Sequence, residues 1–470
     1  MTTSDLHWLS ATQLTKLFKR GEVSPVDVAR ACLGQIAALD GKINAMSLVD
    51  EKTTLKQARA SERRWHKKAN IGPLDGVPLL IKDLLLVKGW PTLRGSKTVN
   101  VNQDWLYDAP SVARLREAGT VFMGLTTTPE FGWKGVTDSL LTGITRNPWN
   151  LDKTPGGSSG GSAAGLAAGY APLALGTDGG GSIRIPASFA GVYGLKPSFG
   201  RVPAWPLSPF GTVAHIGPMT RNVEDAALMM DEITKPDARD WHSLPYDALD
   251  YAHKLKRDVK DMVFAYSPKL GFDVAVEDDV ALLVKAAVAK LRKAGAKIVE
   301  IDPGFKDPAA TFRTVWWLGV RAAFGHLGED KLALLEPALR DVVEQSKSIS
   351  IDEMIAATKA RGELGSQMRQ FMEKFDALLL PTMPITAFEA GRLQPGDPDH
   401  KGKWVNWTPL TYPFNLTQQP AASVPCGIAA NGMPVGLQIV GRMFEDRKVL
   451  RISAAVELAV GGFEPPLFST

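Results

Sequence analysis

Two serines framed by glycines, Ser158 and Ser182, stand 24 positions apart in the segment of residues 155–200. The first lies within PGGSSGGS, and the second follows three consecutive glycines in GTDGGGSIRIP. Glycine loses more backbone entropy on folding than any other residue, so runs of it are expected where the backbone takes a positive φ or approaches a ligand closely. The segment therefore predicts a site built from tight backbone around two hydroxyl groups.

The glycines before Ser182 offer successive unhindered N–H groups. Such preorganised donors stabilise negative charge that develops on a substrate oxygen next to a nucleophile. The residues predicted to form this oxyanion hole are Gly179, Gly180, Gly181 and Ser182.

Two other interpretations of these glycines are weaker. A phosphate-binding P-loop needs Gly-Lys followed by Ser or Thr, and neither segment contains it. Residues 156–160 also fit G-x-S-x-G, the nucleophile elbow of α/β-hydrolases, in which Ser158 would attack and a downstream histidine would act as base. The downstream histidines carry no supporting context; His215 is the one that could face a pocket, although a structural role is favoured for it.

Bulk composition excludes several classes of protein. The 470 residues are 44% hydrophobic and 22% charged with a net charge of +4, and the basic residues are dispersed, so no nucleic-acid partner is expected. Residues 154–177 and 404–441 carry no charge, but glycine, proline and polar residues interrupt them, so no membrane span is expected. The two cysteines form no CxxC pair, and the first 15 residues lack an apolar core, which together predict a cytoplasmic protein.

Short apolar runs alternate with helical patterns along much of the chain. The runs at residues 77–81, 121–125 and 172–175 are suited to buried strands. Capping signals at Ser10 and Ser24 start two N-terminal helices, and an alanine-rich helix is expected at 162–168. This alternation predicts an α/β core.

The serine motifs also carry a family resemblance. The segments GGSSGGS and GTDGGGSIRIPASFAGVYGLKPSFGRVP are similar to the signature of the amidase signature family. Further segments that resemble this family are residues 21–24, 75–83, 128–132, 145–149, 217–221 and 434–438. The resemblance spans nearly the whole chain. It implies an α/β amidase signature fold, in which helices cover both faces of a large, mixed, mostly parallel and twisted sheet.

The resemblance also implies roles for individual residues. Ser182 corresponds to the acylated serine, Ser158 to a serine that follows a cis peptide bond, and Lys82 to the base. The residues expected to bind substrate are Trp133, Ser159 and Thr177. Asp178 and Arg184 flank the nucleophile, and a buried ion pair that shapes the loop is expected of them. No metal or organic cofactor is expected.

The chemistry of the three side chains agrees with these roles. A serine hydroxyl is a poor nucleophile until a neighbouring base takes its proton. Lysine can act as that base only when neutral, which burial without a carboxylate partner permits. The Ser158 hydroxyl can donate to Lys82 and accept from Ser182, because a hydroxyl does both.

The expected protein is one amidase domain over residues 1–470, with N-terminal helices to about residue 70. The domain continues with a signature core at about 71–230. It ends with a C-terminal cap and substrate-pocket part at about 231–470. Pocket segments are expected near Trp133 and at 202–215, 312–323 and 404–412, although core packing is favoured for Phe312 and Trp316-Trp317.

The expected reaction is hydrolysis of a small amide, with ester, anilide and carbamate (urethane) cleavage as possible further activities and a homodimer as a possible assembly. The alternative is the A subunit of a glutamine-dependent aminoacyl-tRNA amidotransferase. Gly179 and Ile185 argue against it, because those subunits usually show threonine and glutamine there.

Overall fold

The computed structural model describes all residues except 1–2, 254, 256–257, 397–402 and 463–470. Its centre is an 11-stranded sheet in the order β1-β3-β2-β6-β8-β7-β12-β13-β11-β9-β10. The strands are β1 (Met46–Val49), β2 (Pro78–Lys82), β3 (Val121–Thr126), β6 (Leu173–Asp178), β7 (Tyr193–Lys196), β8 (His215–Thr220), β9 (Val263–Tyr266), β10 (Lys297–Glu300), β11 (Ala377–Pro381), β12 (Ala421–Ile428) and β13 (Pro434–Gly441). A small separate hairpin pairs β4 (Asp138–Ser139) with β5 (Gly143–Ile144).

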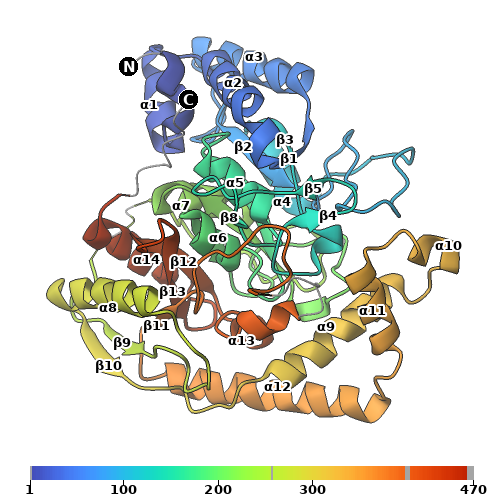
Figure 1. The fold of residues 1–470 in the computed structure, drawn as a ribbon. Coiled ribbons are helices and arrows are strands. Elements are labelled where there is room, and N and C mark those ends of the chain that lie inside the picture. The colour runs from blue at the N-terminus through green and yellow to red at the C-terminus, as the bar shows by residue number, and fades with distance from the viewer. Residues whose placement is uncertain (1–2, 254, 256–257, 397–402, 463–470) are drawn as a thin grey trace.

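Helices surround the sheet, with α1–α3 at one end of the molecule and α8 and α12 at the other (Figure 1). The α-helices are α1 (Ala11–Arg20), α2 (Pro25–Ile43), α3 (Glu51–His66), α4 (Pro110–Glu117), α5 (Gly160–Ala167), α6 (Arg184–Ala190), α7 (Val223–Ile233), α8 (Asp278–Lys293), α9 (Ala309–Phe324), α10 (Glu329–Leu332), α11 (Pro337–Ser346), α12 (Ile351–Met372), α13 (Pro413–Leu416) and α14 (Asp446–Val460). Ser10 and Ser24 cap α1 and α2, as predicted, and both helix starts form capping boxes. Among the described residues, no helix has the length and apolar character needed to cross a membrane.

The sheet is mixed, but parallel pairing is confined to two blocks. Strands β3, β2 and β6 run parallel, as do β11, β9 and β10. Between these blocks, from β6 through β8, β7, β12 and β13 to β11, every pair is antiparallel. The expectation that parallel pairing predominates therefore does not describe the middle of the sheet. Strands buried on both faces are continuous apolar runs in either orientation, so the sequence does not reveal their direction.

Two hydrophobic clusters lie on opposite faces of the C-terminal half of the sheet. Along β11, Ala377 and Leu379 belong to the first cluster, whereas Leu378 and Leu380 belong to the second. Successive side chains of a strand point to opposite faces, so this alternation separates the two clusters. Helices α8 and α14 contribute to the first cluster, and α9, α11 and α12 contribute to the second. Helices therefore cover both faces, as the family resemblance implies.

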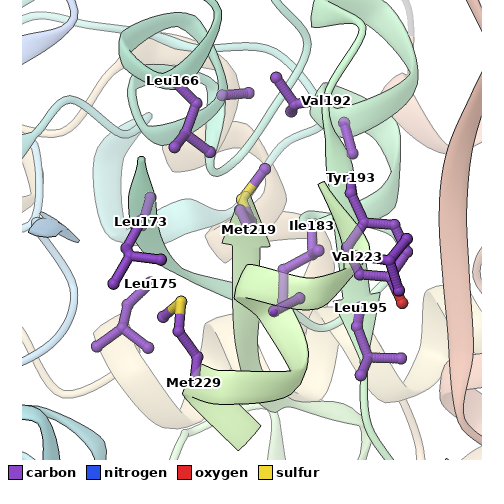
Figure 2. Close-up of a cluster of buried hydrophobic side chains, with 14 of the residues drawn as sticks. Leu166, Leu173, Leu175, Ile183, Val192, Tyr193, Leu195, Met219, Val223 and Met229 are labelled. Carbon is purple, nitrogen blue, oxygen red and sulfur yellow. The ribbon is translucent and has the colours of Figure 1, made fainter. Parts of the chain in front are cut away.

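The fold brings the ends of two neighbouring strands together. Strand β2 pairs in parallel with β6, with Ile81 opposite Leu175, so Lys82 at the end of β2 lies near the end of β6. The chain leaves β6 at Asp178 and passes directly into the glycines before Ser182. Figure 2 shows Ile183 among the core side chains of β6 and β8, so the residue after Ser182 is anchored in the core.

Candidate active site

Lys82 is fully buried, and its amine is surrounded by hydroxyl groups. The Nζ–Oγ distance is 2.7 Å to Ser158 and 2.9 Å to Ser159, and Nζ lies 2.9 Å from Oγ1 of Thr177. Ser158 and Ser159 come from the segment before α5, and Thr177 comes from β6. The structure thus gathers three hydroxyls, from both glycine-rich segments, around one nitrogen.

These three contacts suit a neutral amine. Burial lowers the pKa of Lys82 well below its ordinary value, against an opposing effect of Asp178. A neutral amine has two N–H groups and one lone pair. The Ser159 hydroxyl lies 3.2 Å from the Thr177 carbonyl oxygen and donates to it, so toward Lys82 it accepts. If Thr177 also accepts, the lone pair of Lys82 is left for the O–H of Ser158.

Close packing fixes Ser158. The Gly157–Ser158 peptide bond is cis, as the family resemblance implies. A Cβ added at Gly157 would lie 2.6 Å from the Val136 backbone, and one added at Gly132 would lie 3.1 Å from Ser158 Oγ. Glycine at both positions therefore allows the surrounding chain to approach the Ser158 hydroxyl closely.

Ser182 lies on the wall of a cavity of about 370 Å³ that Ser158 and Thr177 also line. Its carbonyl oxygen accepts from the N–H of Ser159 at 3.1 Å, which ties the two serine segments together. No described residue hydrogen-bonds to Ser182 Oγ, so the contact between the Ser158 and Ser182 hydroxyls is not formed in this conformation. Hydrogen bonds of a catalytic site are often long without substrate and tighten in the complex.

Asp178 and Arg184 form a fully buried ion pair that shapes the loop around Ser182. The guanidinium binds the carboxylate through two contacts, Nε–Oδ2 at 2.9 Å and Nη2–Oδ1 at 3.0 Å. Burial would raise the pKa of Asp178, but Arg184 outweighs this effect and holds the pKa well below its ordinary value. Both residues occupy the supporting position that the sequence predicts for them.

The same carboxylate limits the predicted oxyanion hole. Asp178 Oδ1 accepts the N–H of Gly181 at 2.8 Å, so that N–H is not available to a substrate oxygen in this conformation. An oxyanion-hole role of Gly181 would require this hydrogen bond to break or to be shared. The role of Gly179, Gly180, Gly181 and Ser182 as oxyanion donors stays a prediction.

The cavity wall is largely apolar. Phe210 and Trp316 stack with ring centroids 3.9 Å apart, and both line the cavity. Other apolar lining residues are Leu84, Leu85, Phe131, Phe199, Val202, Ala204, Pro206, Leu207, Pro209, Ala214, Ile216 and Ala323. The predicted pocket segments 202–215 and 312–323 thus supply part of the wall.

Aromatic side chains of α9 also pack directly onto the glycine loop. A Cβ at Gly179 would lie 2.7 Å from the Trp316 ring, and a Cβ at Gly180 would lie 2.6 Å from the Phe312 ring. Phe312 lies behind the wall, stacked on Trp316 at 5.4 Å and on Tyr412 at 4.8 Å. The sequence favours core packing for both Phe312 and Trp316. Phe312 is a core residue, whereas Trp316 packs in the core and also faces the cavity.

Two residues predicted to bind substrate, Trp133 and Ser159, do not line the cavity. Trp133 is buried in the second hydrophobic cluster, where its indole N–H donates to Glu336, and it is not among the described residues that line the cavity. Its carbonyl oxygen accepts from Trp316, so it supports the wall from behind. Ser159 holds Lys82 and Thr177 and does not line the cavity, whereas Thr177 does.

Several lining residues were not predicted from the sequence, among them Arg94, Phe131 and His242. Of these three, only Phe131 lies in a segment that carries a recognisable motif. His215 lines the cavity too, and its Nδ1 lies 2.8 Å from the Val213 carbonyl oxygen, while burial lowers its pKa well below the ordinary value. It is therefore held neutral by its surroundings.

A mixed α/β sheet thus carries a buried lysine and glycine-framed serines beside an apolar cavity, which are the features of a candidate site for acyl transfer to a serine. The chain belongs to the Amidase family, whose model matches residues 27–450.

The relatives point to chemistry on amide bonds. The chain is 36% identical to an acylamidase of Rhodococcus erythropolis, over 97% of this chain and 96% of that one. It is 34% identical to the A subunit of the glutamyl-tRNA(Gln) amidotransferase of Moorella thermoacetica, over 96% of this chain and 97% of that one. A solved bacterial aryl acylamidase of the amidase signature family superimposes with a TM-score of 0.90 at 31% identity, covering 97% of this chain and 96% of that chain. The protein is an amidase, a hydrolase of amide C–N bonds.

Proposed function

We propose that this amidase cleaves aryl or alkyl carboxylic amides through an acyl-enzyme on Ser182, with Ser158 and Lys82 as its proton relay. The observation that carries the proposal is the buried Lys82 amine, held by three hydroxyls at the edge of the cavity that Ser182 lines. Such a lysine accepts a proton at neutral pH, which an exposed lysine does not.

In the first half of the cycle, Ser182 Oγ attacks the amide carbonyl carbon. The Ser182 proton passes to Ser158 Oγ while the Ser158 proton passes to Lys82 Nζ, so the hydroxyl of Ser158 is regenerated. The N–H groups of Gly179, Gly180 and Ser182 bind the oxygen of the tetrahedral intermediate. As the C–N bond breaks, the relay returns the proton to the leaving nitrogen, which departs as a neutral amine or ammonia.

In the second half, water attacks the acyl-enzyme. Its proton follows the same relay to Lys82, and the lysine then returns a proton to Ser182 Oγ as the carboxylic acid leaves. In each half of the cycle, Lys82 releases the proton that it has accepted. The same three residues therefore act as base when a nucleophile attacks and as acid when a group leaves.

Apolar substrates suit the wall of the cavity. A volume of about 370 Å³ is within the range of pockets for small organic ligands. Trp316 and Phe210 present aromatic faces to the cavity, and an aryl or alkyl group of a substrate gains by burial against them. Ester, anilide and carbamate cleavage uses the same attack on a carbonyl carbon and belongs to the proposal as side activities.

Replacing Ser182 with Ala tests the mechanism. The variant is expected to lose about 10³-fold or more of kcat on 4-nitroacetanilide, because no nucleophile remains. A fluorophosphonate probe should label the wild-type enzyme on the peptide that contains Ser182 and leave Ser182→Ala unlabelled, as mass spectrometry would measure.

The exposed Ser348, whose hydroxyl donates to the Gln345 carbonyl, offers a matched control. Ser348→Ala should keep full turnover and full labelling. Retained turnover in Ser182→Ala, or an adduct on another peptide of the wild-type enzyme, would contradict the proposal.

A second candidate is the A subunit of a glutamine-dependent amidotransferase, which the 34% identity to such a protein favours. Against it stands the space around Gly179, where any side chain would meet the Trp316 ring. A threonine, usual in those subunits, would therefore not fit here without rearrangement. Co-purification of partner subunits from the native host, with glutamine hydrolysis that depends on them, would favour this second candidate.

We also propose a cytoplasmic location and a homodimer. Both cysteines are unpaired and buried, which is compatible with a reducing compartment. Cell fractionation and light scattering of the purified protein test these two points.

A further inference from the structure

Arg94 is the one Lys or Arg side chain among the described residues that line the active-site cavity. It also lines a second cavity of about 570 Å³, and the two cavities share Arg94, Phe131 and Ala323. Arg94 therefore lies where the two cavities adjoin. A ligand in the active-site cavity that extends toward the second cavity would pass this residue.

The backbone holds Arg94 near the catalytic residues. Its carbonyl oxygen accepts the N–H of Phe131 at 2.7 Å, and Gly132, the next residue, packs against Ser158. The N–H of Gly95 donates to the carboxylate of Asp83, the residue directly after Lys82, at 3.2 Å. Arg94 is thus tied through short backbone links to the segments that carry Lys82 and Ser158.

The backbone of this segment is also unusual. Arg94 has a φ of 57° and Phe131 a φ of 50°, in the left-handed region that residues other than glycine seldom adopt. Such conformations persist where the surrounding structure enforces them, often at ligand sites. Both residues line the cavity, so the uncommon backbone is found where a ligand would bind.

The Arg94 guanidinium has no ion-pair partner within the part of the chain that the structure describes. It lies over the Phe131 ring, whose centroid is 5.9 Å away, and it interacts with Asp83 only at long range. The Asp83 carboxylate accepts the backbone N–H of Gly95 at 3.2 Å, and burial raises the pKa of this carboxyl group to about 7.

The acidic groups that line the active-site cavity are already engaged. Asp178 pairs with Arg184, and Asp240 accepts the backbone N–H groups of Ala204 and His242. A partly buried guanidinium without a charge partner keeps its fork of donors for another group. The fork matches a carboxylate, which it can bind through two parallel hydrogen bonds.

We infer that Arg94 determines specificity by binding a carboxylate on the substrate, away from the amide bond that is cleaved. The inference rests on the proposed function, since the substrate must reach Ser182. It adds a charged end to the otherwise apolar substrate. The preferred substrates are therefore N-acyl aromatic amino acids or amides of dicarboxylic acids, which keep one free carboxylate.

Matched pairs of substrates test the role of Arg94. On the amine side the pair is 4-acetamidobenzoate and 4-acetamidobenzamide, and on the acyl side it is N-phenylsuccinamate and its carboxamide. Arg94→Gln should lower kcat/KM for at least one carboxylate about 10- to 100-fold and change its uncharged partner less than about 3-fold, since a hydrogen bond to a charged group is lost. The loss should lie in KM, because binding remote from the reacting bond is equal in the ground and transition states.

Two further variants serve as an alternative and as a control. Arg94→Met removes the charge but keeps an unbranched stem, and it replaces Arg94→Gln if that protein folds poorly. Lys97→Gln removes one charge from an exposed residue of the same loop that lines neither cavity, and it should leave all four rates unchanged. Equal losses on charged and uncharged substrates in both Arg94 variants would overturn the inference.

A binding measurement separates this inference from the mechanism. In the Ser182→Ala background, benzoate should raise the melting temperature more than benzamide does, and Arg94→Gln should abolish that difference. This result does not depend on turnover, so it stands even if Ser182 is not the nucleophile. No difference between benzoate and benzamide, together with unselective kinetics, would leave Arg94 a structural residue.

Discussion

Lys82 and Lys134 are both buried lysines, yet their surroundings act on them in opposite directions. Lys82 meets only hydroxyls, and burial lowers its pKa well below the ordinary value. Burial also acts to lower the pKa of Lys134, but Asp138 and Glu336, at 2.7 and 3.0 Å, outweigh it and raise that pKa. Neutral lysine is suited to proton transfer, whereas charged lysine holds two segments together.

This contrast predicts a pH effect on stability. Between the lowered folded-state pKa of Lys82 and the ordinary value of 10.5, the unfolded chain binds one more proton than the folded chain. The wild type therefore gains stability as pH rises through this window, by at most about 1.4 kcal/mol per pH unit, and Lys82→Met lacks that gain. Urea unfolding of both proteins at several pH values from 7 to 10 measures the difference, and Lys82→Met should also lose amide turnover severely.

Lys134→Met is the matched control. It leaves Glu336 buried without its cation, so at pH 7 it should lower the free energy of unfolding by about 3–5 kcal/mol. Because the pKa of Lys134 is raised, its stabilising effect is fully present at pH values below the ordinary lysine pKa of 10.5. This stabilisation is lost only as the pH rises through the folded-state pKa. A stability difference between wild type and Lys82→Met that stays constant with pH would show that Lys82 keeps the same charge in both states.

At the scale of the elements, the turn from β6 into α6 is defined by what packs against it. Helix α9 places Trp316 and Phe312 against Gly179 and Gly180, so the glycines are needed for space as well as for donors. The Asp178–Arg184 pair holds the same turn from within, through the N–H of Gly181. The nucleophile loop and the pocket wall are therefore one packed unit.

Gly179→Ala is expected to destabilise the protein by about 1–3 kcal/mol, because the added Cβ would lie 2.7 Å from the Trp316 ring. Trp316→Ala alone should cost about 3–5 kcal/mol. In the double variant the alanine at 179 should cost little, which a double-mutant cycle from urea unfolding would measure. Full additivity would contradict the contact.

Gly34 in α2 provides the opposite case. A Cβ there meets nothing within 4 Å, and the residue lies in a helix interior. Gly34→Ala should therefore stabilise the protein by about 0.5–1 kcal/mol.

At the scale of the whole molecule, one sheet joins the two halves of the chain. Strand β7 of the N-terminal half pairs with β12 of the C-terminal half, and Cys32 in α2 and Cys426 in β12 belong to the same hydrophobic cluster. Both thiols are buried, and burial raises the pKa of each to about 12. The two cysteines can therefore report on the integrity of both halves.

Native protein at pH 8 should not react with Ellman's reagent, because a buried thiol with a raised pKa is neither accessible nor ionised. In guanidinium chloride, both thiols should react, giving two per chain. Absorbance at increasing denaturant concentration measures the exposure. Reaction of one thiol well before the other would show that the two halves unfold separately.

The sequence by itself indicated the family and the class of reaction. The glycine-framed serines and the motifs around them carry the resemblance to the family, and that resemblance implies the candidate residues Lys82, Ser158 and Ser182. The alternation of apolar runs also predicted an α/β core, and the family resemblance implied helices on both faces of the sheet. Local patterns carry this information because the side-chain periods of strands and helices differ.

Only the tertiary structure decided what each side chain faces. Trp133 points to Glu336 and lies outside the cavity wall, whereas Arg94 lines it, and no local pattern separates the two. The orientation of β7, β8, β12 and β13 is likewise hidden, because strands buried on both faces look alike in either direction. The N–H of Gly181 is engaged by Asp178 through a loop conformation that depends on Arg184 and its distant partners Asn415 and Gln438. Contacts between residues far apart in the chain arise only when the sheet assembles, so they belong to the fold and not to any one segment.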